Sequence, residues 1–260
     1  MRYHAAMRLL SDNPSKRWSE QLVLVYSPIW IAAIGICQLT HIFAHWGDVG
    51  HLAFGLSLAL PLWLVPLLWP SPADRALPLH ERHAVRFAVF IAAWTALQVY
   101  FGSDLFFDVL GMQYHFDVTW LLHRTPLFLY FVTIAYFSTY YVVMQIGWRA
   151  FRTRWPAAPR PLQLAVLLAI GYAVAFAETA GMATERMHDY FSYRDKPFAL
   201  VFGSLSYGSI FAITLPLVYR LDETRQPDGQ RTLGSLVWDA CAANSIVLVV
   251  YALFAAFAGR

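Results

Sequence analysis

The stretch PLQLAVLLAIGYAVAFAETAGM, residues 161–182, decides the fold class of this chain. It is long enough to cross the hydrocarbon core of a bilayer, which takes about 20 apolar residues. Its one charged side chain is Glu178, and a carboxyl group at membrane depth is rare and usually functional. Burial there disfavours the charged form, so we expect Glu178 to hold a proton near neutral pH. The alternative is a structural acid, bonded to a hydroxyl or carbonyl group of a neighbouring helix.

Six further apolar segments of similar length accompany this one. Hydrophobic residues make up 58% of the 260 residues and charged residues only 13%, whereas soluble domains carry about 25%. The sequence therefore predicts an all-α, polytopic integral membrane bundle, with one transmembrane domain over residues 1–260 and a polar N-terminal segment at 1–21. We expect seven spans, near 22–44, 52–70, 86–103, 126–148, 162–182, 198–219 and 233–257.

Positive charge is distributed unevenly between these spans. Fourteen Lys and Arg residues fall in the N-terminal segment and in the loops after the second, fourth and sixth spans, and five fall on the opposite side. Because cytoplasmic loops carry the excess of Lys and Arg, the N-terminus is predicted to be cytoplasmic. The 17 Arg against 2 Lys indicate a GC-rich bacterial source, and a bacterial chain of this kind is expected in the inner membrane.

Cysteine usage and the N-terminal residues exclude several other classes of protein. Cys37 and Cys241 both fall in predicted spans and form no CxxC motif, so we expect neither a disulfide framework nor a zinc finger. The first apolar run is too long for a signal peptide, so no cleaved leader is expected. The expected partners are membrane lipid and a lipid-like substrate, with no nucleic acid.

Polar side chains collect on the predicted outer side. Gln38, His41 and His45 are three and four residues apart and form one stripe at the end of the first span. If the fifth helix continues past residue 182, Glu185 and Asp189 share a face with Glu178. We expect the loop near 104–125 to close over these two stripes, and many nearby aromatic residues to be interfacial anchors.

Three functions from different classes fit this pattern. The first is acid–base chemistry on a lipid, with Glu178 as the acid, a His or Asp as the base and aromatic rings stabilising a cation. The second is a membrane metalloenzyme that uses His41 and His45 with His115 and His123. An HxxxH spacing alone is a weak signal for a metal, and His41 and His45 alternatively cap a helix end. The third is a lipid-binding protein or transporter.

Five motifs occur in order along the chain: NPSKRW (13–18), PADR (72–75), FFDVLGMQYHF (106–116), AET (177–179) and YRLDE (219–223). From about residue 11 to residue 257, the sequence resembles the cycloeucalenol cycloisomerase family, also called sterol cyclopropyl isomerases. The resemblance implies opening of the 9β,19-cyclopropane ring of sterols such as cycloeucalenol, to give a Δ8 sterol such as obtusifoliol. It implies no redox cofactor, because only protons move. Plant members act in the endoplasmic reticulum, and a bacterial relative could take cycloartenol or another polycyclic lipid.

The residue roles follow from this resemblance and from the residues themselves. Glu178 matches a shared motif and is expected to protonate the cyclopropane methylene. Candidate bases for the neighbouring proton are, in order of preference, His115, Asp108 and His188. Substrate contacts are expected from Tyr114, Phe107, Trp94, Gln38, His41 and Tyr190. No metal is expected.

The motifs at Lys16–Arg17 and Asp222–Glu223 lie on the predicted inner side. They either hold the sterol hydroxyl or cap and anchor helices, and we favour the second role.

Overall fold

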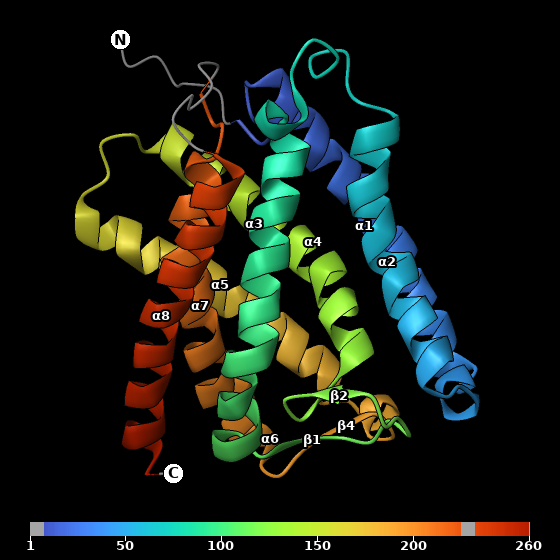
Figure 1. Ribbon diagram of the computed structural model, residues 1–260. Coiled ribbons are helices and arrows are strands. Elements are labelled where there is room, and N and C mark those ends of the chain that lie inside the picture. Colours follow the sequence, from blue (N-terminus) through green and yellow to red (C-terminus); the bar gives the residue numbers. More distant parts are fainter. Residues whose placement is uncertain (1–7, 225–231, 260) are drawn as a thin grey trace.

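Within the part of the chain that the computed structural model describes, residues 8–224 and 232–259, seven helical segments are long and apolar enough to cross a membrane. The predicted class, an all-α membrane bundle, is confirmed (Figure 1). Arg2, Arg225, Arg231 and Arg260, used above to orient the chain, lie outside the described residues, and the orientation stays a prediction.

The spanning segments include two composite helices. The bounds are α1 Pro14–Leu39, α2 Asp48–Leu68, α3 His83–Leu97, α4 Leu127–Arg154, α5 Arg160–Met182, α6 Lys196–Phe198, α7 Ser204–Arg220 and α8 Leu233–Ala258. Helix α3 continues through π-helical turns at Gln98–Gly102 and Leu105–Val109, and α6 joins α7 through a third π-helical turn at Ala199–Gly203. Short 3-10 turns occur at Ile42–His45, Leu79–Glu81 and Glu185–Met187.

Helix α1 begins at Pro14, well before the predicted start of the first span at 22. The side chain of Asn13 caps it by accepting a hydrogen bond from the backbone N–H of Ser15 at 3.0 Å. Proline suits the first helical position because its missing N–H would be unpaired there. The first turns carry Lys16 and Glu20, which are buried, so a search for apolar residues alone starts the helix too late.

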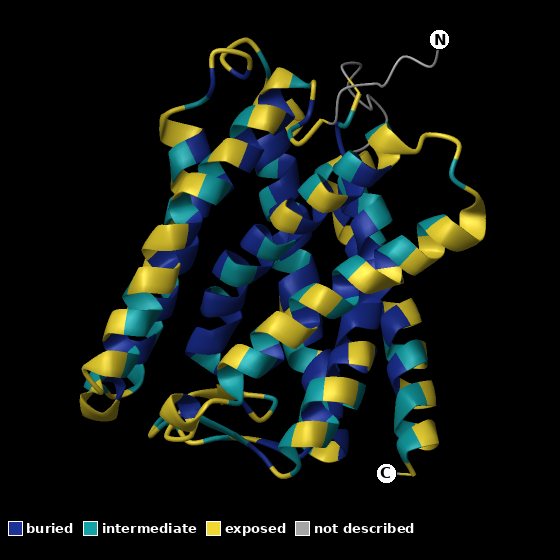
Figure 2. Cartoon of the chain, turned by 180° about the vertical axis from the view of Figure 1, so that it is seen from behind, coloured by how far each residue is buried: buried dark blue, intermediate teal, exposed yellow. Residues whose placement is uncertain are grey.

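Helix α4 lies at the centre of the bundle. In its most apolar window 72% of residues are buried, against 22% in α1 and in α5. Figure 2 shows the long tilted helix α5 from behind, with many exposed residues on its outward face, and only four residues of α5 are buried. The outer helices therefore position side chains toward α4 from one face only.

The backbones of α5 and α7 pack in direct contact. The buried residues of α5 recur every four positions, at Leu167, Gly171, Ala175 and Thr179, and form one narrow stripe. A Cβ atom on Gly171 would lie 2.4 Å from the carbonyl oxygen of Gly208 on α7. Small residues allow this close approach of membrane helices. The contact brings the C-terminal part of α5, with Glu178, against α7.

Two pairs of short strands cover one end of the bundle, at the bottom of Figure 1. Strand β1, Met112–Tyr114, pairs antiparallel with β4, Phe191–Tyr193, and residue 113 lies opposite residue 192. Strands β2, Leu121–Leu122, and β3, Thr125–Pro126, form a second small pair. The paired strands satisfy the backbone hydrogen bonds of two irregular loops, which apolar surroundings require.

A cluster of buried ionisable residues ties the opposite end together. We call it the charged cluster, and its members are the buried residues Lys16, Glu20, His83, Arg86, Arg149 and Asp222 and the partly buried Glu223. The ammonium group of Lys16 donates to the carbonyl oxygens of Tyr219 at 2.7 Å and Leu221 at 2.8 Å. These carbonyl groups belong to the C-terminal end of α7, so the predicted capping role of this motif is confirmed.

Each carboxylate of the charged cluster lies beside a basic side chain. Arg149 contacts Glu20 at 2.6 Å and Glu223 at 2.7 Å, and Arg86 pairs with Asp222. Burial opposes ionisation of Asp222, but the hydrogen bond from His83 and the nearby positive charges outweigh it and hold the pKa of Asp222 below its ordinary value. Burial likewise opposes ionisation of Glu223, but the hydrogen bond from Arg149 and the charge of Lys16 hold its pKa below the ordinary value.

Candidate functional site

A cavity lies between the spans near the end that β1 and β4 cover. Its walls come from α1, α2, α4, α5, α7, α8 and the π-helical extension of α3, and residues of both strands line it as well. Tyr114 and Phe116 line the cavity from the loop between α3 and α4, so this loop covers the cavity at that end. The loop covers the cavity, whereas His41 and Glu185 of the two polar stripes over which it was expected to close do not line this cavity.

Glu178 is the acidic residue of this cavity. Within the described part of the chain, no other Asp or Glu and no Lys, Arg or His lines it. The hydroxyl group of Tyr207, on α7, donates to Glu178 Oε2 at 2.8 Å. Tyr140, on α4, also hydrogen-bonds the carboxyl group. Glu178 keeps some accessible surface because the cavity reaches it. The carboxyl group is thus held by phenols, without a cation beside it.

Phenol and benzene rings form most of the remaining surface around Glu178. Seven tyrosines line the cavity among the described residues: Tyr114, Tyr136, Tyr140, Tyr190, Tyr193, Tyr207 and Tyr251. Tyr207 packs edge to face on Phe106, with ring centroids 5.1 Å apart. Burial raises the pKa of Tyr114 and of Tyr193, so these two phenols stay protonated at neutral pH. Neutral aromatic rings of this kind attract a cation to their faces.

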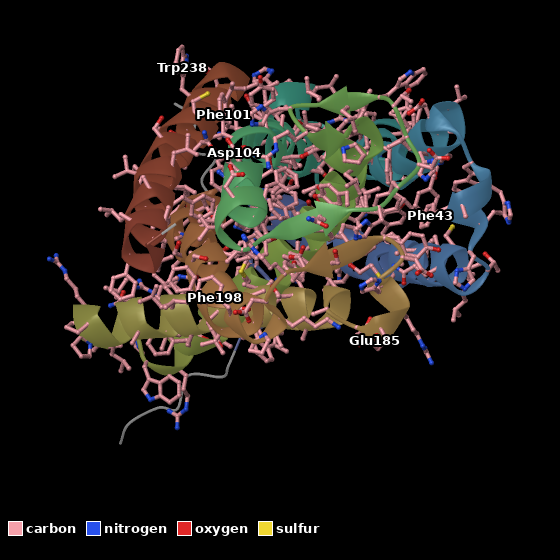
Figure 3. All side chains as sticks on the ribbon, turned by 90° about the horizontal axis from the view of Figure 1, so that it is seen from below. Phe43, Phe101, Asp104, Glu185, Phe198 and Trp238 are labelled. Atoms are coloured by element: carbon pink, nitrogen blue, oxygen red, sulfur yellow. The ribbon has the colours of Figure 1, made fainter. Side chains whose placement is uncertain are left out.

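The side of the cavity toward α1 and α2 is mainly aromatic. Phe43, which lies between the first two spans, contacts Phe54, Phe116 and Tyr190 with ring centroids 5.3–5.9 Å apart. Seen from below, Phe43 lies on the opposite side of the bundle from Trp238 of α8 (Figure 3). The cavity therefore runs from an acid and its phenols to an aromatic end.

Four of the residues singled out from the sequence line the cavity, and six do not. Those that line it are Glu178, Gln38, Tyr114 and Tyr190. His115 follows β1 and lies between Tyr114 and Phe116, which both line the cavity, but it does not line the cavity itself. Its side chain is exposed and forms a hydrogen bond with Ser192 Oγ at 2.7 Å, and its ring stacks near that of His188 at 6.2 Å.

The other candidates that miss the cavity are held elsewhere. Asp108 is exposed and pairs with Arg124 at 3.0 Å, and the guanidinium group of Arg124 lies 4.6 Å above the ring of Phe107. Trp94 is completely buried in the packed core. His41 is exposed, 3.9 Å from Asp189. The roles assigned to these side chains stay predictions, and the proposal below does not use them.

The expected continuation of the fifth helix past Met182 is wrong. Ala183 ends α5, and the chain turns through Glu185–Met187 into β4. Glu185 therefore does not share a helical face with Glu178. It is exposed, as Figure 3 shows, and its carboxylate pairs with Lys196 at 3.1 Å. That ion pair, a hydrogen bond first and the charge second, holds the pKa of Glu185 below its ordinary value.

The histidines of the metalloenzyme hypothesis do not gather. Among the described residues, no group of three or more His, Cys, Asp or Glu side chains is arranged to hold a metal ion. His41 has a left-handed backbone, with φ 53°, which ends the regular helix before His45. The i, i+4 geometry that the HxxxH spacing presupposes is therefore absent.

Sequence reasoning missed the phenols that hold Glu178. Tyr140 and Tyr207 lie on different helices, and each looks like an ordinary aromatic residue of a membrane span. The one available signal was the four-residue spacing of Tyr136 and Tyr140, which places both on one face of α4.

Comparison with known proteins gives one informative match. The chain is 29% identical over 255 residues to a protein of Arabidopsis thaliana named cycloeucalenol cycloisomerase, and the match covers 96% of this chain and 89% of the plant protein. No protein-family model and no solved structure matches the chain. The match covers nearly the whole chain and confirms, at the level of the family, the resemblance that the five motifs indicated.

Proposed function

We propose that this relative of the plant cycloeucalenol cycloisomerase is itself a sterol isomerase that opens a 9β,19-cyclopropane ring by moving protons. The observation that carries the proposal is Glu178, an acid that lines an apolar, aromatic cavity within the membrane-spanning helices. The name of the plant protein supplies the substrate class. A mostly apolar cavity between membrane-spanning helices suits a sterol, which would enter from the membrane lipid.

In the proposed reaction, protonated Glu178 gives its proton to the cyclopropane methylene carbon, C19. The C9–C19 bond breaks, its electron pair forms the new C–H bond, and C19 becomes a methyl group on C10. Positive charge is left on C9. The faces of the surrounding tyrosine and phenylalanine rings stabilise this cation in a site where water competes little.

The second proton transfer completes the reaction. The C8–H bond supplies its electrons to a new C8=C9 double bond, which gives the Δ8 product, and its proton leaves. Because His115, Asp108 and His188 do not line the cavity, we propose that the Glu178 carboxylate formed in the first step takes this proton. In 9β,19-cyclopropyl sterols the C8 hydrogen lies on the same face as the cyclopropane, so one carboxyl group can serve both steps and ends each cycle protonated.

The phenols hold the acid in position for both steps. Tyr207 donates to Oε2 of the carboxyl group, and Tyr140 is a second phenol that hydrogen-bonds it. After the first transfer the same hydrogen bonds stabilise the carboxylate, and a positioned acid–base group typically contributes about 10²–10⁴-fold in rate.

The test is incubation of the purified protein with cycloeucalenol or cycloartenol, with the position of the product double bond read by mass spectrometry. In deuterated water the new methyl group gains deuterium. When unlabelled substrate is mixed with substrate deuterated at C8 in ordinary water, a single shared carboxyl group passes deuterium into the methyl group of unlabelled molecules. Transfer of this label supports one shared carboxyl group, because a separate base would give the C8 hydrogen to water. Methyl groups that take deuterium fully from deuterated water and none from C8 would show that the C8 hydrogen is lost to water before the next turnover.

Glu178→Gln is the matched variant. It keeps the size and hydrogen-bonding capacity of the side chain but removes the acid, so we expect turnover to fall by about 10²–10⁴-fold while sterol binding is retained. Glu185→Gln, which removes an exposed carboxylate outside the cavity, serves as the control. Turnover close to the parent level in Glu178→Gln would refute the assignment, and binding without any turnover in the parent would favour a lipid-binding protein.

A further inference from the structure

A second polar group lines the cavity, on the wall formed by α3 and α8. Gln98 begins the π-helical turn that follows α3, and Tyr251 belongs to α8. Both side chains line the cavity, and they are only 6% and 5% exposed. Polar groups buried this deeply are nearly always hydrogen-bonded, so each one requires a partner.

The hydroxyl group of Tyr251 has no hydrogen-bond partner within the described residues. Gln98 is held differently, because its Nε2 donates to Oδ1 of Asn244 on α8. That bond fixes the amide group and leaves Gln98 Oε1 as an acceptor. The wall thus offers one phenol that can donate and one carbonyl oxygen that can accept.

Gly102 makes room for both of these side chains. A Cβ atom at this position would lie 2.8 Å from Gln98 Oε1 and 3.4 Å from Cε2 of Tyr251. The π-helical turn places the glycine there, and π-helical turns inside α-helices occur frequently at functional sites. Both polar side chains therefore pack next to Gly102, where the backbone carries no side chain.

We propose that Gln98 and Tyr251 bind the ring-A hydroxyl group of the sterol, an inference that rests on the proposed function. An alcohol both donates and accepts a hydrogen bond. Its hydrogen is donated to Gln98 Oε1, and its oxygen accepts from the hydroxyl group of Tyr251. This ligand satisfies both protein groups at once.

The placement of Gln98 and Tyr251 in the same cavity as Glu178 fits the distance between the hydroxyl group and the cyclopropane of the sterol. Tyr251 and Glu178 line the same cavity. In the sterol, the hydroxyl group is attached to C3 and the cyclopropane includes C10, and these two carbons are opposite members of ring A. The protein groups that bind the hydroxyl and protonate the cyclopropane must therefore lie close together. The flexible tail then extends toward the aromatic end around Phe43. The two polar groups set the direction in which the sterol lies.

The test compares cycloeucalenol with its 3-deoxy analogue in direct binding to the purified full-length protein. We expect Tyr251→Phe to weaken binding of cycloeucalenol about tenfold, the value of one hydrogen bond in a dry site, and to leave binding of the 3-deoxy analogue unchanged. Gln98→Met is expected to act in the same way. Tyr172→Phe removes a phenol that does not line the cavity and serves as the control.

The outcomes separate this inference from the proposed function. Turnover with equal binding of the two sterols, or an equal loss for both in Tyr251→Phe, overturns the inference alone. Binding that depends on the hydroxyl group, without turnover, supports the inference and overturns the isomerase assignment. Failure of the parent to bind either sterol overturns both.

Discussion

The two ends of this bundle bury carboxyl groups in opposite ways. In the charged cluster, Glu20 and Asp222 lie beside Arg149 and Arg86. In the cavity, Glu178 has phenols beside it and no cation among the lining residues. A buried carboxylate with a cation keeps its charge and fixes helices, whereas one held by phenols is free to exchange a proton. The difference indicates which buried acid is structural and which is chemical.

The largest expected effect is on stability at the charged cluster. Arg149→Leu leaves Glu20 and Glu223 without their guanidinium partner, and breaking a buried pair from one side costs about 3–5 kcal/mol. Chemical denaturation in detergent measures this loss. Turnover per folded molecule is expected to stay the same, because this end is remote from the cavity.

Arg152→Leu is the matched control for that variant. Arg152 lies on the same helix but bonds Gln163 near the surface, so its loss is expected to change stability by less than about 0.5 kcal/mol. If the two variants were equally stable, the ion pairs of Arg149 in the charged cluster would not stabilise the fold.

The second prediction concerns a variant in which Glu178, like the acids of the charged cluster, has a cation beside it. Met182 lines the cavity one helical turn after Glu178, so Met182→Lys places an ammonium group beside the carboxyl group. The cation favours the carboxylate and removes the proton that the reaction needs. We expect turnover to fall about 100-fold or more, as measured by product analysis.

Met182→Gln is the control, because it introduces a neutral polar side chain. The comparison of the two variants separates the effect of the charge from the loss of the thioether. A lysine variant that turned over as fast as the glutamine variant would show that the proton donor is a different group.

The smallest predicted effect is the dependence of stability on pH at the charged cluster, which is absent near neutral pH and develops in acid. The pKa values of Asp222 and Glu223 lie below their ordinary values, so the folded state binds fewer protons than the unfolded state. Their stabilisation is therefore complete above about pH 5, where both groups are ionised in the unfolded state as well, and is lost as the pH falls through the lowered values. We expect the melting temperature to drop between about pH 4 and pH 2, and Asp222→Asn to drop less. Equal acid sensitivity of the variant and the parent would contradict this.

The sequence predicted the spans and the acid because both depend on local composition. Some 20 apolar residues in a row specify a membrane helix, and a single carboxyl group stands out within them. It could not predict which histidines reach the cavity. His115 and Tyr114 are neighbours in sequence, but Tyr114 lines the cavity and His115, just after β1, is exposed. Tyr140 and Tyr207 meet Glu178 only through helix packing, which leaves no periodic signal along the chain.

The contact between Gly171 and Gly208 links helix spacing to chemistry. A side chain at either glycine meets the main chain of the opposite helix, and the helices can relieve that clash only by moving apart. Such a movement also lengthens the bond between Tyr207 and Glu178, because these residues lie on the same two helices. A saturation-mutagenesis screen scored by product formation would therefore rank both glycines beside the acid itself, although neither glycine reaches the sterol.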